Sequence, residues 1–71
     1  MSMSEKIRIA LIKRNMTISS LAEALGSSSQ NLSAKLKRDN FSQRDLEDIA
    51  KALNCTLEIT FIDNDTGESI I

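Results

Sequence analysis

Residues 28–40 carry a run of short uncharged polar side chains, which is followed by cations. The amide group of Gln30 has the geometry to pair with an adenine edge through two hydrogen bonds, and the hydroxyl of Ser29 can exchange hydrogen bonds with several bases. Lys37 and Arg38 follow about two helical turns later, where positive side chains can bind phosphates. A surface that only kept a domain soluble would more often carry lysine and glutamate. The segment therefore indicates recognition of nucleic-acid bases and backbone.

Apolar residues at helical spacing predict four helices that would position these side chains. Ser4 is expected to cap the first helix, and Gly26 is expected to end the second by adopting the left-handed conformation. The third helix is expected to begin at Ser27 or Ser28 and to end at residues 39–40, so that it carries the polar run. The four helices are expected at residues 4–14, 18–25, 28–38 and 43–54.

A second pattern begins after the fourth helix and predicts a C-terminal β-hairpin. Residues 56–61 alternate between apolar and polar side chains, which is the period of a half-buried strand. The stretch DNDTG at 63–67 is typical of a turn, and residues 69–71 are expected to return as a short second strand. Because an isolated hairpin is only marginally stable, we expect it to pack on the face of the first helix that carries Ile9 and Ile12.

The chain has 71 residues and a net charge of −1, but its charges are unevenly distributed. Residues 1–54 hold all nine lysines and arginines against six acids, so this part carries +3. Residues 55–71 hold the other four acids and no base, so this part carries −4. The helical part alone therefore has the charge expected of a nucleic-acid binder. The length allows one domain, in which 1–54 forms the helical bundle and 55–71 the hairpin.

Residue types on which most enzymes and metal sites depend are scarce. Because there is no histidine, serine and threonine hydroxyls lack their usual base, and we expect no catalysis. With Cys55 as the single cysteine, neither a disulfide nor a zinc site is expected, and no cofactor or small-molecule ligand is indicated. No apolar run has the length of a membrane span and no signal peptide is recognisable, so we expect a cytoplasmic protein that does not bind membranes.

The stretch TISSLAEALGSSSQNLSAKL at residues 17–36 has the pattern of two short helices joined by a tight turn. In this pattern it resembles the phage-repressor-like helix-turn-helix family of the Cro and cI (XRE) kind, through Thr17, Leu21-Ala22, Gly26, a small cap residue and Leu32. The resemblance covers about residues 4–54. It implies a mainly α, lambda-repressor-like bundle, here of four helices with a C-terminal β-hairpin. It also implies a homodimer that binds double-stranded DNA and regulates transcription.

Carried onto this sequence, the family's base-reading positions fall on Ser28, Ser29, Gln30 and Ala34. The helical wheel agrees, because Gln30 and Ala34 point outward when Leu32 and Leu36 point inward. Further contacts, to the DNA backbone, are expected from Thr17, Asn31, Ser33, Lys37, Arg38 and Asn40. A basic cluster of Lys35, Lys37, Arg38 and Arg44 is expected beside them.

Three alternatives stay open on the sequence alone. The serines are also compatible with simple helix capping. The same fold is compatible with a protein-interaction adaptor or an antitoxin-like module, which is favoured by the weak basic charge and by Ile18, where the family commonly has glutamine. The hairpin either completes the core of one molecule or joins two copies. In the second case the homodimer interface is expected at Leu57, Ile59, Phe61 and Ile62.

Overall fold

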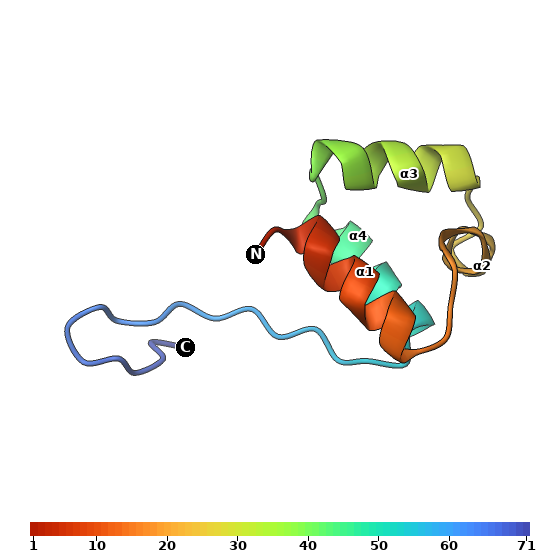
Figure 1. The fold of residues 1–71 in the computed structure, drawn as a ribbon. Helices are drawn as coiled ribbons and strands as arrows, with labels where there is room; N and C mark the ends of the chain where they lie inside the picture. The colour runs from red at the N-terminus through yellow and green to blue at the C-terminus, as the bar shows by residue number, and fades with distance from the viewer.

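Four helices follow one another in the computed structural model, which describes residues 1–71 (Figure 1). They are α1 (Met3–Lys13), α2 (Ile18–Ala24), α3 (Ser29–Arg38) and α4 (Gln43–Ala52). A serine or threonine precedes each helix and accepts a hydrogen bond from a backbone N–H of the first turn. None of the helices is long and apolar enough to cross a membrane. The mainly α architecture and the number of helices agree with the sequence-based prediction.

The start of α1 corrects that prediction at one position. Ser2, and not Ser4, is the N-cap: its hydroxyl accepts a hydrogen bond from the N–H of Glu5 at 3.1 Å. The carboxylate of Glu5 accepts one from the N–H of Ser2 at 3.3 Å, which completes a capping box. Ser4 is buried at the surface that α1 turns toward α3.

Each helix is followed closely by a residue with positive φ, which lets the chain reverse direction. The expected ends of the second, third and fourth helices are confirmed in this respect. These residues are Asn15, Gly26, Asp39 and Asn54, with φ between 53° and 69°. Asparagine, aspartate and glycine tolerate this conformation better than other residues.

The core is small and is supplied by all four helices. Leu21 of α2 has no exposed surface and lies among the other core residues. The eight core residues are Ile7, Leu11, Leu21, Ala22, Leu32, Leu36, Ile49 and Leu53. α3 contributes only Leu32 and Leu36 to this core, so its apolar contact with the bundle is one narrow stripe.

The C-terminal segment is not the packed β-hairpin that the sequence predicts. Its turn forms as expected, with Gly67 at φ +74° and its N–H donating to the C=O of Asp63 at 2.8 Å. However, no strand forms, and a single antiparallel bridge joins Ile62 to Ser69. The physical reason is the short return of the chain: residues 56–60 make no backbone–backbone hydrogen bond, and two short strands alone are marginal.

The expected packing of this segment on α1 is also wrong. In Figure 1 the chain after α4 passes the end of α1 and runs away from the helices before it turns back on itself. Ile9 and Ile12 of α1 therefore remain 41% and 74% exposed. Phe61 and Ile62 of the C-terminal segment are likewise exposed.

Candidate nucleic-acid interface

A tight turn joins α2 to α3 and fixes the angle between them. The N–H of Ser27 donates to the C=O of Ala22 at 2.9 Å, and the N–H of Gly26 donates to the C=O of Glu23 at 3.0 Å. These two bonds form the Schellman pattern of helix ends, which requires the positive φ that Gly26 adopts. Ala22 and Leu32 are both buried, so the two helices are held together closely on the core side.

α3 lies at the border of the helical body (Figure 1). Most of its polar residues are exposed. Gln30 is exposed and Ala34 is half-buried. Both project from the side of the helix opposite the buried Leu32 and Leu36. The amide of Gln30 has no hydrogen-bond partner within the protein, so it can serve an external ligand.

The two serines at the start of α3 are engaged in the structure of the turn. Ser28 is the N-cap, and its hydroxyl accepts a hydrogen bond from the N–H of Asn31 at 3.1 Å. The hydroxyl of Ser29 lies 3.3 Å from that of Ser19 on α2. Both residues remain exposed, and the Ser28 hydroxyl keeps its proton to donate. Capping and contact with a ligand are therefore compatible for Ser28.

The side chains expected to contact the DNA backbone are spread around the unit formed by α2 and α3. Thr17 caps α2: its hydroxyl accepts from the N–H of Ser20 at 3.0 Å, and its own N–H donates to the Ser20 hydroxyl at 2.9 Å. Ser33 is exposed on α3, and Asn40 is exposed just after this helix. Asn31 lines a hollow between α3 and α4, on the flank of α3 that faces α4.

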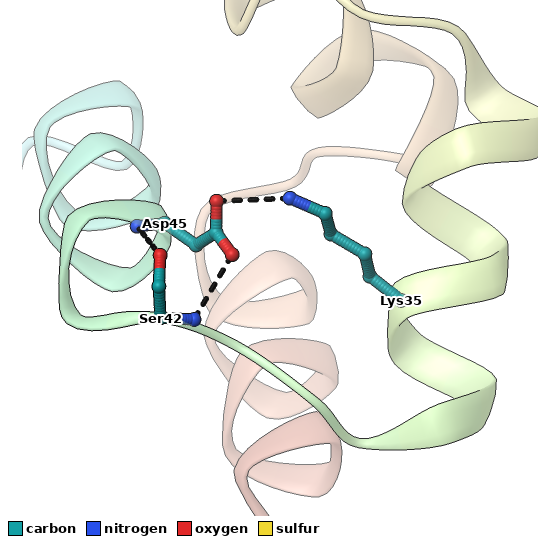
Figure 2. A network of polar contacts seen from close by, with 3 residues as sticks. All are labelled: Lys35, Ser42 and Asp45. Carbon is teal, nitrogen blue, oxygen red and sulfur yellow. Dashed lines mark hydrogen bonds and ion pairs between the residues drawn. The ribbon is translucent and has the colours of Figure 1, made fainter.

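The cations near the end of α3 divide into two groups. Lys37 and Arg38 are exposed and pair with no acid. Lys35, in contrast, donates to the carboxylate of Asp45 on α4 at 2.9 Å, as Figure 2 shows. The expected basic cluster is therefore incomplete, because Lys35 is directed toward α4 and its charge is balanced there.

Asp45 connects that ion pair to the cap of α4. The second carboxylate oxygen of Asp45 accepts a hydrogen bond from the N–H of Ser42 at 3.0 Å, and the Ser42 hydroxyl accepts one from the N–H of Asp45 at 3.0 Å (Figure 2). The hydrogen bond from Lys35, followed by the one from the Ser42 backbone, lowers the pKa of Asp45 below its ordinary value. This network ties the start of α4 to the middle of α3.

A second connection, which the sequence-based prediction missed, holds the C-terminal end of α3 to α1. The buried hydroxyl of Ser4 donates to the C=O of Leu36 at 2.6 Å and lies 2.9 Å from a carboxylate oxygen of Asp39. The same oxygen accepts a hydrogen bond from the N–H of Ser4 at 2.8 Å. The signal available in the sequence was the pair Ser2 and Glu5, whose capping box leaves Ser4 free for this role.

The four residues expected at a dimer interface lie outside the helical body. Leu57 is half-buried close to α4, whereas Ile59, Phe61 and Ile62 are 59–68% exposed. The structure thus places the expected base-reading residues on α3 and at its N-cap, and it leaves three of the four expected interface residues exposed.

Comparison with known proteins adds one finding. The family model of the Cro/C1-type helix-turn-helix DNA-binding domain matches residues 6–58, which is about three quarters of the chain. No curated protein and no solved structure matches the chain. The matched region includes all four helices except the first residues of α1.

Proposed function

The chain belongs to the family of Cro/C1-type helix-turn-helix DNA-binding domains, and from that premise we propose that it is a dimeric, sequence-specific regulator of transcription. The observation that carries the proposal is the outward face of α3. There an exposed amide, small uncharged groups and two unpaired cations follow one another along one helix. In helix-turn-helix proteins the second helix of the unit enters the major groove with its N-terminal residues at the base edges.

In the proposed complex, the first half of α3 reads bases. Gln30 pairs with an adenine through its amide, and Ala34 contacts a thymine methyl group. Ser28 and Ser29 donate to base edges or to the adjoining backbone. Their short side chains support this assignment, because a helix needs small groups to lie deep in the groove.

The rest of the unit binds the DNA backbone. Lys37 and Arg38 neutralise phosphates and supply most of the salt-dependent affinity. The remaining contacts come from uncharged groups at the ends of the helices and along α3, namely Thr17, Asn31, Ser33 and Asn40. These contacts position α3 on the duplex and add no sequence preference of their own.

We infer that two copies act together through the C-terminal segment. One copy of α3 covers a short site, and helix-turn-helix dimers recognise two such half-sites. The exposed apolar side chains of Ile59, Phe61 and Ile62 support an interface there. The acids of this segment would keep it away from DNA phosphates.

Selection of bound duplexes from a random pool tests the proposal. We expect enrichment of a sequence with two-fold symmetry, and we expect the Gln30→Ala variant to select a relaxed version of it. Gln43→Ala is the matched control, because Gln43 is an exposed glutamine that belongs to α4 and not to α3. Absence of any enriched sequence would contradict base reading and would favour the protein-interaction module.

A further inference from the structure

An apolar hollow opens between α1 and α4, next to the point where the C-terminal segment leaves the bundle. Its volume is about 250 Å³. Nine of the twelve residues that line it are hydrophobic, among them Ala10 of α1, Ala50 of α4 and Leu57. The side chain of Leu57 thus faces the hollow from the C-terminal segment but leaves space beside it. A hollow of this composition on the surface of so small a core calls for an apolar occupant.

The backbone next to this hollow has an unpaired edge. At the bridge, the C=O of Phe61 accepts from the N–H of Ile70, and the N–H of Asp63 donates to the C=O of Glu68, both at 2.8 Å. Because backbone groups alternate in direction along an extended chain, Ile62 directs its N–H and C=O away from the returning chain. Residues 56–60 make no backbone–backbone hydrogen bond at all. An edge of this kind is a template for pairing with another strand.

A second copy of the chain can pair with this edge along its whole length in one register. The unpaired edge spans residues 56–62, and Ile59 is its middle residue. When a two-fold axis passes at Ile59, the edges of two antiparallel copies overlap over their full length. In this antiparallel register Phe61 of one copy lies directly opposite Leu57 of the other. Opposite residues project from the same face of a two-stranded ribbon, with Cβ atoms about 4.5–5.5 Å apart. Since Leu57 faces the hollow, Phe61 of the second copy faces it too.

The charges agree with the same register. Asp63 of one copy then lies opposite Cys55 of the other, and the guanidinium of Arg14 is 3.4 Å from the sulfur of Cys55. Arg14 pairs with no acid in the single chain. The register therefore brings Asp63 of one copy close to the unpaired Arg14 of the other. The two residues belong to parts of opposite net charge, −4 for residues 55–71 and +3 for residues 1–54.

We propose that the hollow between α1 and α4 is the binding site for Phe61 of a second copy, so that each molecule of the dimer completes the core of the other. This inference rests on the proposed homodimer and adds the site, the register and the residue that enters it. In this dimer, Leu57 of one copy and Phe61 of the other form one apolar cluster over Ala10 and Ala50. Arg14 pairs with Asp63 of the second copy.

The chain contains no tryptophan or tyrosine, so Phe61→Trp introduces a single fluorophore at the proposed contact. We expect its emission to shift to shorter wavelength as protein concentration rises, in parallel with dimer formation in sedimentation equilibrium. Ile71→Trp is the matched control, because Ile71 is 88% exposed and lies outside the register, so its emission should stay that of a solvated indole. Adding Ala10→Lys to Phe61→Trp should abolish the shift, whereas Ala24→Lys on the exposed side of α2 should not.

Phe61→Ala tests the native side chain, and it leaves the bundle folded because Phe61 lies outside the core. We expect it to raise the dimer Kd by at least about 10-fold, while Ile71→Ala has little effect. A dimer that is unchanged by Phe61→Ala and shows no shift in emission would overturn this inference and leave the homodimer intact. A shift that does not depend on concentration would assign the hollow to the same chain and overturn it as well. A chain that is monomeric at every concentration would overturn the homodimer and this inference together.

Discussion

Gln30 is the residue at which base reading can be separated from general affinity for DNA. If its exposed amide pairs with an adenine, Gln30→Ala should lose about 1–3 kcal/mol on the preferred duplex and little on a duplex with that base pair changed. Lys37→Ala should weaken binding to all sequences alike and reduce the dependence of log K on log salt by about one unit. Both effects are measured by titration of labelled duplexes at several salt concentrations.

The matched controls for this pair are Gln43→Ala and Lys51→Ala, two exposed residues of α4 outside the outward face of α3. Equal loss on every duplex after Gln30→Ala would remove Gln30 from the base-reading set. A salt dependence unaffected by Lys37→Ala would remove Lys37 from the phosphate contacts.

Glycine is required at position 26 because of the backbone conformation there, and not because a neighbouring atom lies close. A Cβ at this position would meet no atom within 4 Å, but the residue holds φ at +69°. We therefore expect Gly26→Ala to reduce the free energy of unfolding by about 1–2 kcal/mol. Gly26→Asn should cost less, because asparagine tolerates the left-handed region. Urea unfolding followed by circular dichroism measures both, and equal losses for the two variants would contradict an origin in φ.

At the scale of elements, the turn at Gly26 holds the N-terminal end of α3 and two polar connections hold its C-terminal half. Ser4 tests one of these two connections. Ser4→Ala removes the buried hydrogen bond to the C=O of Leu36 and should destabilise the fold by about 1–2 kcal/mol. Because this bond joins α1 to the end of α3, we also expect weaker binding to DNA. Ser2→Ala is the control: it removes the cap of the same helix, at about 1 kcal/mol, without touching α3.

The comparison separates positioning from stability. If binding to DNA falls equally in Ser4→Ala and Ser2→Ala at temperatures where both are folded, Ser4 contributes only stability. A larger loss of affinity in Ser4→Ala shows that the bond holds α3 at the angle needed in the groove. Duplex titration at a temperature well below both unfolding transitions provides the measurement.

The network of Lys35, Ser42 and Asp45 predicts a dependence of stability on pH. The hydrogen bonds from Lys35 and from the Ser42 backbone hold the pKa of Asp45 below its ordinary value of 3.8. The unfolded chain therefore takes up the proton at higher pH than the folded one. The resulting stabilisation is fully present above about pH 4 and is lost as pH falls through the folded-state pKa.

We expect Asp45→Asn to reduce the free energy of unfolding by about 1 kcal/mol at pH 7, since it removes a half-buried ion pair and half of a capping box. The difference from the unsubstituted chain should shrink as pH falls below 4. Lys35→Ala should reproduce part of the effect, because it removes the largest cause of the pKa shift. Urea unfolding between pH 2 and 7 measures this, and a difference that is constant with pH would contradict it.

The elements also show how far the sequence is predictive. Capping residues, helical spacing and the left-handed Gly26 are local signals, and they predict α2, α3 and α4 within a few residues. The role of Ser4 depends on a contact 32 residues away in the sequence, so no local pattern reveals it. The alternation of residues 56–61 predicts a strand, and this prediction is wrong for the single chain, where no strand forms. Pairing depends on a partner strand as well as on local alternation, and two short strands alone are marginal.

For the whole molecule, the C-terminal segment decides the shape. The radius of gyration is 13.7 Å, whereas a compact chain of this length would have about 11 Å. The longest dimension, 42 Å, exceeds the other two, 24 and 19 Å, because the segment extends from the bundle (Figure 1). A single copy thus leaves most of the apolar surface of its C-terminal segment in water. A dimer joined through this segment would cover that surface.

Such a dimer makes a prediction about the spacing of the DNA site. Two copies of α3 related by a two-fold axis fit half-sites on the same side of the duplex, one helical turn or a multiple of it apart. Inserting about five base pairs between the half-sites, half of a helical turn, should rotate one half-site to the opposite side. We expect affinity to fall at least about 10-fold, toward that of a single half-site, and to recover in part when a full turn is inserted. Titration of duplexes with graded insertions measures this. Affinity that does not depend on the spacing would mean that each copy binds DNA alone. The C-terminal segment would then have a role other than joining a DNA-bound dimer.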